Sequence, residues 1–409
     1  MQEMQEPPGN SPSKLSYRPD IDGLRAVAVS AVVLFHAFPG FWPGGFVGVD
    51  IFFVISGYLI SNIIFEGLDR RTFSLRFFYE RRVRRIFPAL IIVLACSLIF
   101  GWFVLLPYEY EQLGLHVAAG AGFASNLVLW SEIGYFDSEA NTKPLLHLWS
   151  LGIEEQFYLL WPLLSIFLWR YSSRRRMVSI ILLFLASLTS NVLLVKHYPE
   201  ASFYCPFTRF WELLAGSLLT LATRPEPSRR NAMLQFAQRW SGVASFVGFS
   251  MIIFALVFLK ESFAFPGWWA TLPVLGTTLV VLGGPRGPLN VLVLSSRPMI
   301  FIGSVSYPLY LWHWPLLTFT RVIEGSEPAL LVRLTAVLVS LILAWVTYRF
   351  VETPIRRARG PTAYRRLLAL SLAAVALGTT VNLQAHVLAR TLPNSHELAQ
   401  LKWDGRPPG

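Results

Sequence analysis

Charged residues are scarce in this sequence: they occupy 14% of 409 positions, whereas an ordinary soluble domain carries about 25%. Hydrophobic residues make up 54%, and some apolar runs, such as residues 91–106, contain no charge at all. This composition excludes a disordered chain, a collagen and a water-soluble enzyme. It predicts an all-α integral membrane protein that crosses the bilayer many times.

Cysteine is also rare, and Cys96 and Cys205 have neither metal-ligand nor disulfide spacing, so we expect no metal site. Basic residues exceed acidic ones by 35 to 24. Because the arginines lie between apolar spans, this excess indicates membrane topology and argues against nucleic-acid binding. Residues 1–16 include Glu3 and Glu6 and lack an apolar core, so we expect a disordered cytoplasmic tail and no cleavable signal peptide.

Eleven apolar runs are long enough to count as membrane-spanning helices if tilt and partial burial are allowed. They cover residues 24–38, 46–68, 88–106, 149–169, 177–195, 207–223, 241–259, 270–284, 302–320, 328–350 and 367–388. A twelfth segment, residues 113–130, is rich in Gly and Ala. It is open to three interpretations: a further span, a re-entrant helix, or a helix at the membrane surface.

The distribution of Lys and Arg favours a non-spanning segment at 113–130. On that assumption one side of the membrane receives 22 of these residues, in loops 69–87, 170–176, 224–240, 285–299 and 351–366. Loops 39–45, 107–146, 197–206, 260–269 and 323–327, on the other side, hold only Lys143 and Lys260. The positive-inside rule then predicts a cytoplasmic N-terminus and an outer C-terminus.

This topology divides the chain into four parts. They are the tail at 1–16, a transmembrane domain at 17–352, a basic inner loop with the eleventh helix at 353–388, and an outer tail or linker at 389–409. No internal repeat of the kind found in many transporters is visible.

Ionisable residues at membrane depth are functional candidates, because burying a charge in lipid is costly. Arg25 and His36 are eleven residues apart, which places both on one helix face about 16 Å apart along the axis. Taken alone, this pair is better explained by a topology anchor and a structural histidine.

A second group begins at His147. Glu154 follows seven residues later on the same helix face, about 10 Å below the outer end of the helix, which matches the expected depth of His36. An imidazole that takes a proton and a carboxylate that fixes its tautomer are the parts needed for general-base catalysis on a hydroxyl. Alternatively, Glu154 neutralises a structural arginine such as Arg209 or Arg333.

Two further polar residues lie in the glycine-rich second span, where close helix packing or the approach of a ligand is possible. Asp50 either orients a histidine or caps the helix, and Ser56 either bonds a neighbouring carbonyl or faces a substrate. A later cluster, residues 304–315, holds Tyr307 and His313 among aromatics and two prolines. It indicates an irregular helix that lines a cavity.

The stretch 77–88 predicts an arginine-dense amphipathic helix on the cytoplasmic side, with Arg81, Arg82, Arg84 and Arg85. These arginines suit anionic lipid headgroups. They equally suit the phosphates of a cytosolic donor such as coenzyme A, which bidentate guanidinium contacts recognise.

Six motifs in this order closely resemble the membrane acyltransferase-3 family. They are Asp22-Gly23-Leu24-Arg25-Ala26 with His36 beyond it, the run from Gly44 to Asp50, Phe52-Phe53-Val54-Ile55-Ser56-Gly57, the run from Arg81 to Pro88, Trp149-Ser150-Leu151 through Tyr158, and Ser306-Tyr307 through Pro315. The resemblance spans residues 17–352 and is greatest to the O-antigen branch. Many members of that branch carry an outer SGNH-hydrolase-like domain after an eleventh helix.

The resemblance implies that His36 is the essential histidine with Arg25 as its paired arginine, and that Glu154 is the family's acidic residue. It also implies that Arg81, Arg84 and Arg85 face acyl-CoA. The resulting candidate site is catalytic at His36, Glu154, Arg25 and Asp50, binds the donor at Arg81, Arg82, Arg84 and Arg85, and binds the acceptor at His147, Trp149, Ser150, Ser56, Tyr307 and His313.

The sequence therefore predicts a multi-pass O-acyltransferase of the bacterial inner membrane. It would move an acyl group, most simply acetyl from cytosolic acetyl-CoA, to a hydroxyl of a cell-surface glycan such as the O-antigen of lipopolysaccharide. Expected partners are acyl-CoA, the glycan, membrane lipid and an outer SGNH-type domain or separate protein. The alternatives are an acyltransferase for a small molecule or lipid-linked sugar, and a proton-coupled transporter. His36 is either a base, an acyl carrier or both.

Overall fold

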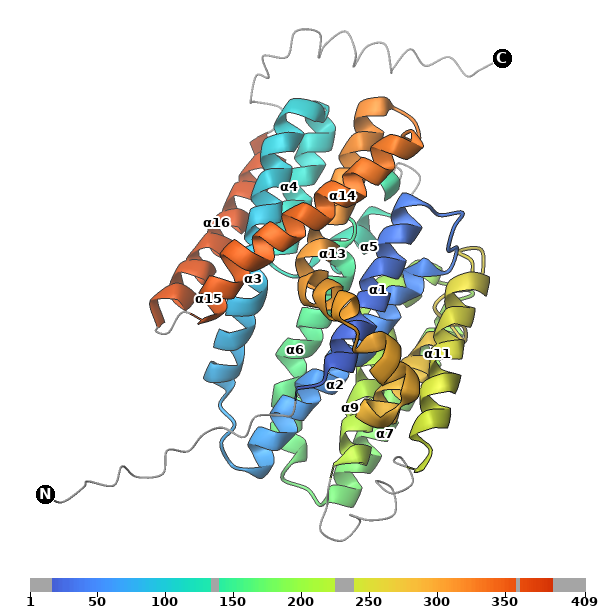
Figure 1. Cartoon of the computed structure of the whole chain (residues 1–409). Coiled ribbons are helices and arrows are strands. Elements are labelled where there is room, and N and C mark those ends of the chain that lie inside the picture. Colours follow the sequence, from blue (N-terminus) through green and yellow to red (C-terminus); the bar gives the residue numbers. More distant parts are fainter. Residues whose placement is uncertain (1–16, 134–139, 225–238, 358–360, 385–409) are drawn as a thin grey trace, which may run out of the picture.

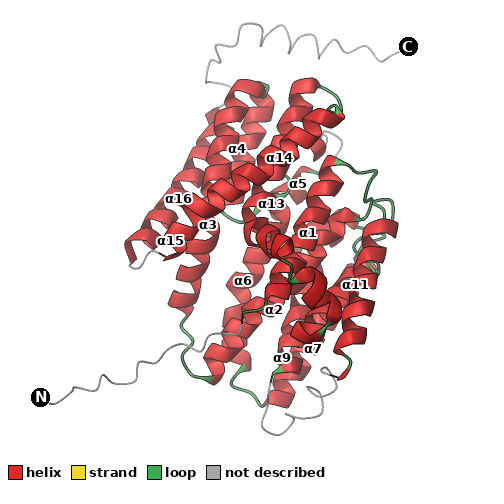
Figure 2. Cartoon of the chain, in the orientation of Figure 1, coloured by secondary structure: helices red, strands yellow, loops and turns green. Residues whose placement is uncertain are grey.

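The computed structural model describes residues 17–133, 140–224, 239–357 and 361–384. Every regular element in these ranges is helical, and the helices form one elongated bundle (Figures 1 and 2). The all-α prediction is confirmed for this part of the chain. The predicted tails at 1–16 and 389–409 lie outside the described residues.

The α-helices follow the predicted apolar runs closely. They are α1 (Pro19–Ala37), α2 (Gly48–Asp69), α3 (Leu75–Val104), α4 (Pro107–Ala121), α5 (Ser125–Glu132), α6 (Leu148–Leu168), α7 (Ser173–Leu194), α8 (Pro199–Tyr204), α9 (Pro206–Thr223), α11 (Ser241–Phe258), α12 (Thr271–Gly283), α13 (Arg297–Glu324), α14 (Leu330–Val346), α15 (Thr353–Arg357) and α16 (Pro361–Gln384). A π-helix, η5 (Thr347–Glu352), joins α14 to α15.

Each of the eleven predicted spans overlaps a helix, but only some of these helices are long and apolar enough to cross a membrane by themselves. In the described chain, seven segments are long and apolar enough to do so: Gly45–Asp69, Leu75–Val104, Leu148–Leu168, Ser173–Leu194, Ser241–Phe258, Leu330–Arg357 and Thr362–Leu383. Among the others, α12 has only 13 residues, and α1 carries Asp20, Asp22 and Arg25 near its start. A multi-pass architecture is supported, while the count of eleven and the sidedness stay predictions.

The segment 113–130 is not one straight helix. It divides between α4 and α5, and Phe123 in the connection adopts a left-handed conformation with φ of 56°. The chain turns back at this point and brings the end of α5 beside α4. The Glu132 carboxylate there lies 2.8 Å from His116 Nε2 and 2.9 Å from Lys143 Nζ. Burial alone would raise the pKa of Glu132, but the bonds from His116 and Lys143 outweigh it and lower that pKa. This hairpin argues against a straight twelfth span, and the re-entrant and surface interpretations both stay predictions.

The last described helix, α16, runs antiparallel along α4 at one edge of the bundle (Figure 1). Ser371 Oγ donates to the carbonyl of Ala121 at 3.1 Å, and Asn382 Nδ2 donates to the carbonyl of Glu111 at 3.2 Å. Between these two contacts, Gly378 lies so close to α4 that an added Cβ would come within 2.6 Å of the Gly114 carbonyl oxygen. The hairpin and the last helix therefore pack as one unit.

The helices around the centre of the bundle also approach each other through glycines. A Cβ on Gly303 of α13 would lie 2.0 Å from the Asp22 carbonyl oxygen of α1. A Cβ on Gly57 of α2 would lie 1.9 Å from the Leu213 carbonyl oxygen of α9. Small residues let helix backbones pack closely where side chains would hold them apart. These close pairs, α1 with α13 and α2 with α9, hold six of the fourteen candidate site residues, and α3 and the start of α6 supply the other eight.

Substitution of Gly216 by alanine should separate α2 from α9. The new Cβ would meet the Val54 carbonyl oxygen at 2.2 Å, and a backbone atom cannot move aside without moving its helix. Overpacking of this kind costs about 1–3 kcal/mol. Thermal unfolding of the detergent-solubilised protein should show a lowered midpoint for Gly216→Ala. The midpoint of Gly40→Ala should equal that of the wild type, because its new Cβ would meet nothing within 4 Å. Equal midpoints would disprove this packing.

Candidate active site

Three neighbouring cavities contain almost all the candidate residues. The arginine cavity, about 610 Å³, is lined by Ile63, Phe77, Phe78, Glu80, Arg81, Arg82, Arg84, Arg85, Arg356 and Arg357. The central cavity, about 90 Å³, includes Arg25, Ser56, Ser150, Glu154, Tyr158, Tyr307 and Tyr310. The histidine cavity, about 460 Å³, includes His36, Asp50, His147, Trp149, Arg209, Trp314 and Arg321.

The cavities follow one another because they share walls. Arg82 and Arg85 line both the arginine cavity and the central cavity. Val49 and Tyr310 line both the central cavity and the histidine cavity. The central cavity is thus the narrow link between two larger spaces.

The arginine cavity gathers the four predicted donor-binding arginines of α3. Arg81 lies over the Phe77 ring at 4.5 Å, and Arg84 pairs with Glu80. Arg356 and Arg357 of α15 add two guanidinium groups from a second element, although sequence reasoning counted them only as topology signals. The sequence feature that could have indicated this role is their position directly after the apolar run 328–350. Six guanidinium groups beside one acidic residue form a site suited to a polyanion.

The central cavity is built around Glu154. Its carboxylate accepts hydrogen bonds from Ser56 Oγ at 2.6 Å and from the hydroxyl of Tyr158, which sequence reasoning did not single out. Arg82 stacks on the Tyr158 ring at 4.2 Å and so connects this cavity to the arginine cavity. Arg25 also lines the central cavity. Ser56 and Glu154 are therefore brought together as candidates, beside Arg25.

The opposite end of the central cavity is closed by Tyr310. Its hydroxyl lies 2.6 Å from Ser150 Oγ and donates to the His147 carbonyl oxygen at 2.7 Å. Tyr307, one turn earlier, donates to the Ile86 carbonyl oxygen at 2.8 Å. These tyrosines tie α13 to α6 and α3, and Tyr310 lies between the central cavity and the histidine cavity.

In the histidine cavity, His36 ends α1 and contacts α13. Its Nδ1 atom lies 3.0 Å from Nε2 of His313, and the two rings are nearly parallel with centroids 5.3 Å apart. Trp314 packs edge-on against His36 at 4.5 Å. Arg321 donates to the His36 carbonyl oxygen at 2.8 Å. His147, at the start of α6, has its ring 5.8 Å from that of His313, so three of the protein's histidines meet here.

Two predicted arrangements are wrong. Glu154 does not hold the imidazole of His36: it lies in the central cavity beside Arg25, eleven residues before His36 on α1. Asp50 does not orient a histidine: its carboxylate lies 3.2 Å from Nη2 of Arg209. The alternative that Glu154 neutralises Arg209 is also wrong, because Arg209 pairs with Asp50. The partner of His36 in the described chain is His313.

Asp50 belongs to a buried charged cluster that sequence reasoning did not assemble. Arg209 of α9 pairs with Asp50 and, through Nη1, with Glu212 at 3.2 Å. Asp50 and Glu212 are 0% exposed and Arg209 is 1% exposed. The sequence does contain a sign of this cluster, since Arg209 and Glu212 are charged residues within the otherwise apolar run 207–223. Asp50 and Arg209 of this cluster line the histidine cavity.

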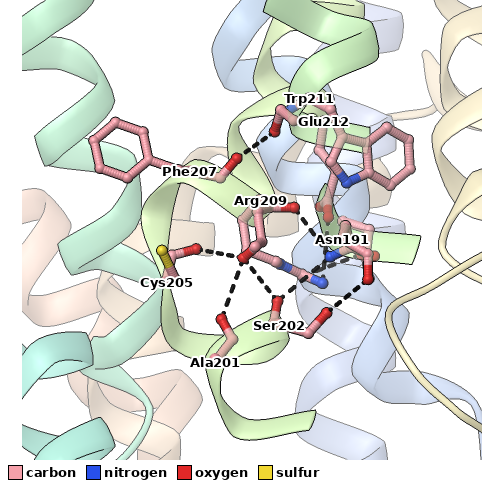
Figure 3. Close-up of polar contacts among 11 residues, drawn as sticks. Asn191, Ala201, Ser202, Cys205, Phe207, Arg209, Trp211 and Glu212 are labelled. Atoms are coloured by element: carbon pink, nitrogen blue, oxygen red, sulfur yellow. Dashed lines mark hydrogen bonds and ion pairs between the residues drawn. The ribbon is translucent and has the colours of Figure 1, made fainter. Parts of the chain in front are cut away.

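The start of α9 is held rigidly, which fixes the position of Arg209 (Figure 3). Asn191 of α7 donates to the Thr208 carbonyl oxygen at 3.0 Å, and Ser202 of α8 donates to the Asn191 carbonyl oxygen at 3.2 Å. Thr208 Oγ1 in turn donates to the Ser202 carbonyl oxygen at 2.9 Å. Helices α7, α8 and α9 thus form one polar junction behind the guanidinium.

A helical bundle with an arginine cavity linked to buried histidines agrees with the family suggested by the motifs. The chain belongs to the acyltransferase-3 family: the family model described as an acyltransferase domain matches residues 18–349.

Similar curated proteins include three bacterial enzymes. Peptidoglycan O-acetyltransferase OatA of Listeria monocytogenes is 33% identical over 355 residues, which cover 83% of this chain and 56% of the relative. Putative peptidoglycan O-acetyltransferase YrhL of Bacillus subtilis is 33% identical over 356 residues (83% and 55%), and O-acetyltransferase OatA of Staphylococcus aureus is 32% identical over 352 (83% and 57%). The chain thus spans a little over half the length of these relatives. No solved structure matches it significantly.

Proposed function

We propose that the chain is an O-acetyltransferase of the bacterial inner membrane, which takes acetyl from cytosolic acetyl-CoA and delivers it to a hydroxyl of a cell-envelope glycan. The observation that carries the proposal is the row of three cavities, with arginines at one end and His36 at the other. A donor and an acceptor that arrive from opposite ends of this row would meet near the histidine.

The arginine cavity supports the choice of donor. Coenzyme A carries several phosphate groups on its nucleotide, and guanidinium groups bind phosphates through paired, charge-assisted hydrogen bonds. The thioester lies at the end of a thin, unbranched arm. A central cavity of about 90 Å³ is too small for the nucleotide, so the thin arm is the part of the donor that would enter it. Arg85, which lines both spaces, would hold the phosphate nearest the entrance.

His36 supplies the chemistry in this proposal. The acceptor hydroxyl gives its proton to the imidazole while its oxygen attacks the thioester carbonyl carbon. A C–O bond forms, the C–S bond breaks, and the departing sulfur takes the proton back from the imidazolium. The products are the acetyl ester and coenzyme A with a free thiol, so atoms and charge balance.

The names of the relatives favour peptidoglycan as the acceptor over the O-antigen that the motifs suggested, and both are sugar hydroxyls. Because the relatives are longer than this chain, we include an outer SGNH-type domain or a separate protein as the proposed partner for final transfer. Comparing acetyl release onto peptidoglycan fragments and onto O-antigen by the membrane-embedded protein distinguishes the two acceptors.

Removal of Arg85 should weaken binding of acetyl-CoA. One charge-assisted hydrogen bond contributes about 1.5–3 kcal/mol, which corresponds to about a 10- to 100-fold loss of affinity for Arg85→Ala. Equilibrium binding of radiolabelled acetyl-CoA to purified protein in liposomes measures this loss. Arg174→Ala is the matched control, because Arg174 is exposed at the start of α7. Unchanged affinity in Arg85→Ala, or no binding to the wild type, would contradict the proposal.

A further inference from the structure

His313 is completely buried, with 0% of its surface exposed, and both of its ring nitrogens have partners. Nδ1 lies 3.2 Å from the carbonyl oxygen of Leu309, one turn earlier on α13. Nε2 lies 3.0 Å from Nδ1 of His36. His313 is enclosed within the bundle, so it is placed to act through His36 and not on a substrate.

The two contacts fix where the protons are. A carbonyl oxygen can only accept a hydrogen bond, so Nδ1 of His313 carries a proton and donates a hydrogen bond to the Leu309 carbonyl oxygen. In a neutral imidazole the other nitrogen is then an acceptor, so Nε2 of His313 receives a hydrogen bond. The donor must be Nδ1 of His36. The Nε2 atom of His36 is thereby left with its lone pair.

The surroundings oppose the other arrangement, in which both histidines are charged. Two imidazolium rings with facing nitrogens 3.0 Å apart would repel each other in a buried setting, and Arg321 adds a further positive charge beside His36. The His36 ring is also held in place, since Trp314 packs edge-on against it and Trp314 Nε1 is itself bonded to the Lys143 carbonyl oxygen at 2.9 Å. The ring therefore has one orientation and one neutral tautomer.

We propose that His313 is a positioning residue, which sets the tautomer of His36 so that its Nε2 lone pair faces the histidine cavity as the proton acceptor. The inference rests on the proposed acetyltransferase function for its catalytic meaning. When His36 takes the acceptor's proton on Nε2, its bond to His313 becomes charge-assisted and stronger. A neutral imidazole thus performs here the orienting task that a carboxylate performs in a Ser-His-Asp triad.

The first test reads the tautomer directly. Solid-state NMR of the full chain in lipid, with ¹⁵N-labelled histidine, should show a protonated Nδ1 and an unprotonated Nε2 for His36, assigned by loss of the signals in His36→Ala. In His313→Leu, which removes the acceptor, the His36 signals should become a mixture of both tautomers. A wild-type His36 protonated on Nε2 would overturn the proposal.

The second test separates positioning from structure. His313→Leu should lower kcat by about 10- to 100-fold, as removal of an orienting partner typically does, while the KM for acetyl-CoA stays within twofold. His313→Gln, whose side-chain oxygen reaches the same place as an acceptor, should recover most of kcat. His197→Leu, at an exposed histidine, should change neither quantity. Full kcat in His313→Leu, or equal losses in the Leu and Gln variants, would contradict the role.

These measurements distinguish the inference from the proposed function. A wild-type protein that shows the expected tautomer but transfers no acetyl group would overturn the function. A protein that transfers acetyl with the opposite tautomer would overturn only the role of His313.

Discussion

Replacement of His36 by alanine is expected to lower acetyl transfer by about 10³-fold or more, the largest effect of any single substitution in the cavities. A positioned general base accelerates proton transfer by about 10²–10⁴-fold. His36 lines the histidine cavity, and His313 occupies its Nδ1 atom, so the inferred tautomer leaves Nε2 as the proton acceptor. If the imidazole also carries the acetyl group transiently, the loss would be complete.

The measurement is transfer of label from acetyl-CoA by purified protein in liposomes, with wild type and variants at equal concentration. His36→Ala should still bind acetyl-CoA normally, since the arginine cavity is separate from the histidine cavity. His197→Ala provides the matched control, because His197 is exposed after α7. Transfer by His36→Ala above a tenth of the wild-type rate would remove His36 from the catalytic centre.

Replacement of Arg209 by leucine is expected to destabilise the whole bundle. The change leaves the carboxylates of Asp50 and Glu212 buried without their shared guanidinium. Removing one partner from a buried ion pair costs about 3–5 kcal/mol, because the remaining charge is neither solvated nor paired. Thermal unfolding in detergent should show a midpoint well below that of the wild type, with reduced yield from membranes.

Two comparisons make this prediction specific. Arg70→Leu breaks a surface pair with Glu66, in which Arg70 is 53% exposed, and should have almost no effect. The triple variant Asp50→Asn, Arg209→Leu and Glu212→Gln removes all three charges and should recover much of the lost stability. If Arg209→Leu unfolds at the wild-type temperature, or if the triple variant is no better, then charge compensation is not what holds this cluster.

The sequence predicts the helices well because burial in lipid requires long apolar runs, and such runs are a local property. All eleven runs coincide with helices for this reason. Residues 113–130 are harder, since a Gly- and Ala-rich composition suits a straight helix and a hairpin alike. The turn depends on Phe123 adopting a left-handed conformation and on the bond between His116 and Glu132, which composition does not reveal.

The candidate site was predictable residue by residue but not contact by contact. Helical spacing gives the depth of a residue along its own axis, so Arg25 and His36 were correctly separated on α1. It says nothing about the offset between two helices, which is why Glu154 was placed beside His36 when it lies in the next cavity. The contact between His36 and His313 joins residues 277 apart in the chain, so no local pattern records it.

The narrowness of the central cavity has an energetic consequence for the cell. A passage wide enough for a glycan or a nucleotide would also let hydrated ions through and discharge the membrane potential, which stores about 2.3 kcal/mol per charge for every 100 mV. The link of about 90 Å³ is too small for a glycan or a nucleotide, and the hydrogen bond between Tyr310 and Ser150 closes it on one side. Under the proposed function only a small acetyl group changes sides, and the membrane remains electrically insulating throughout the reaction.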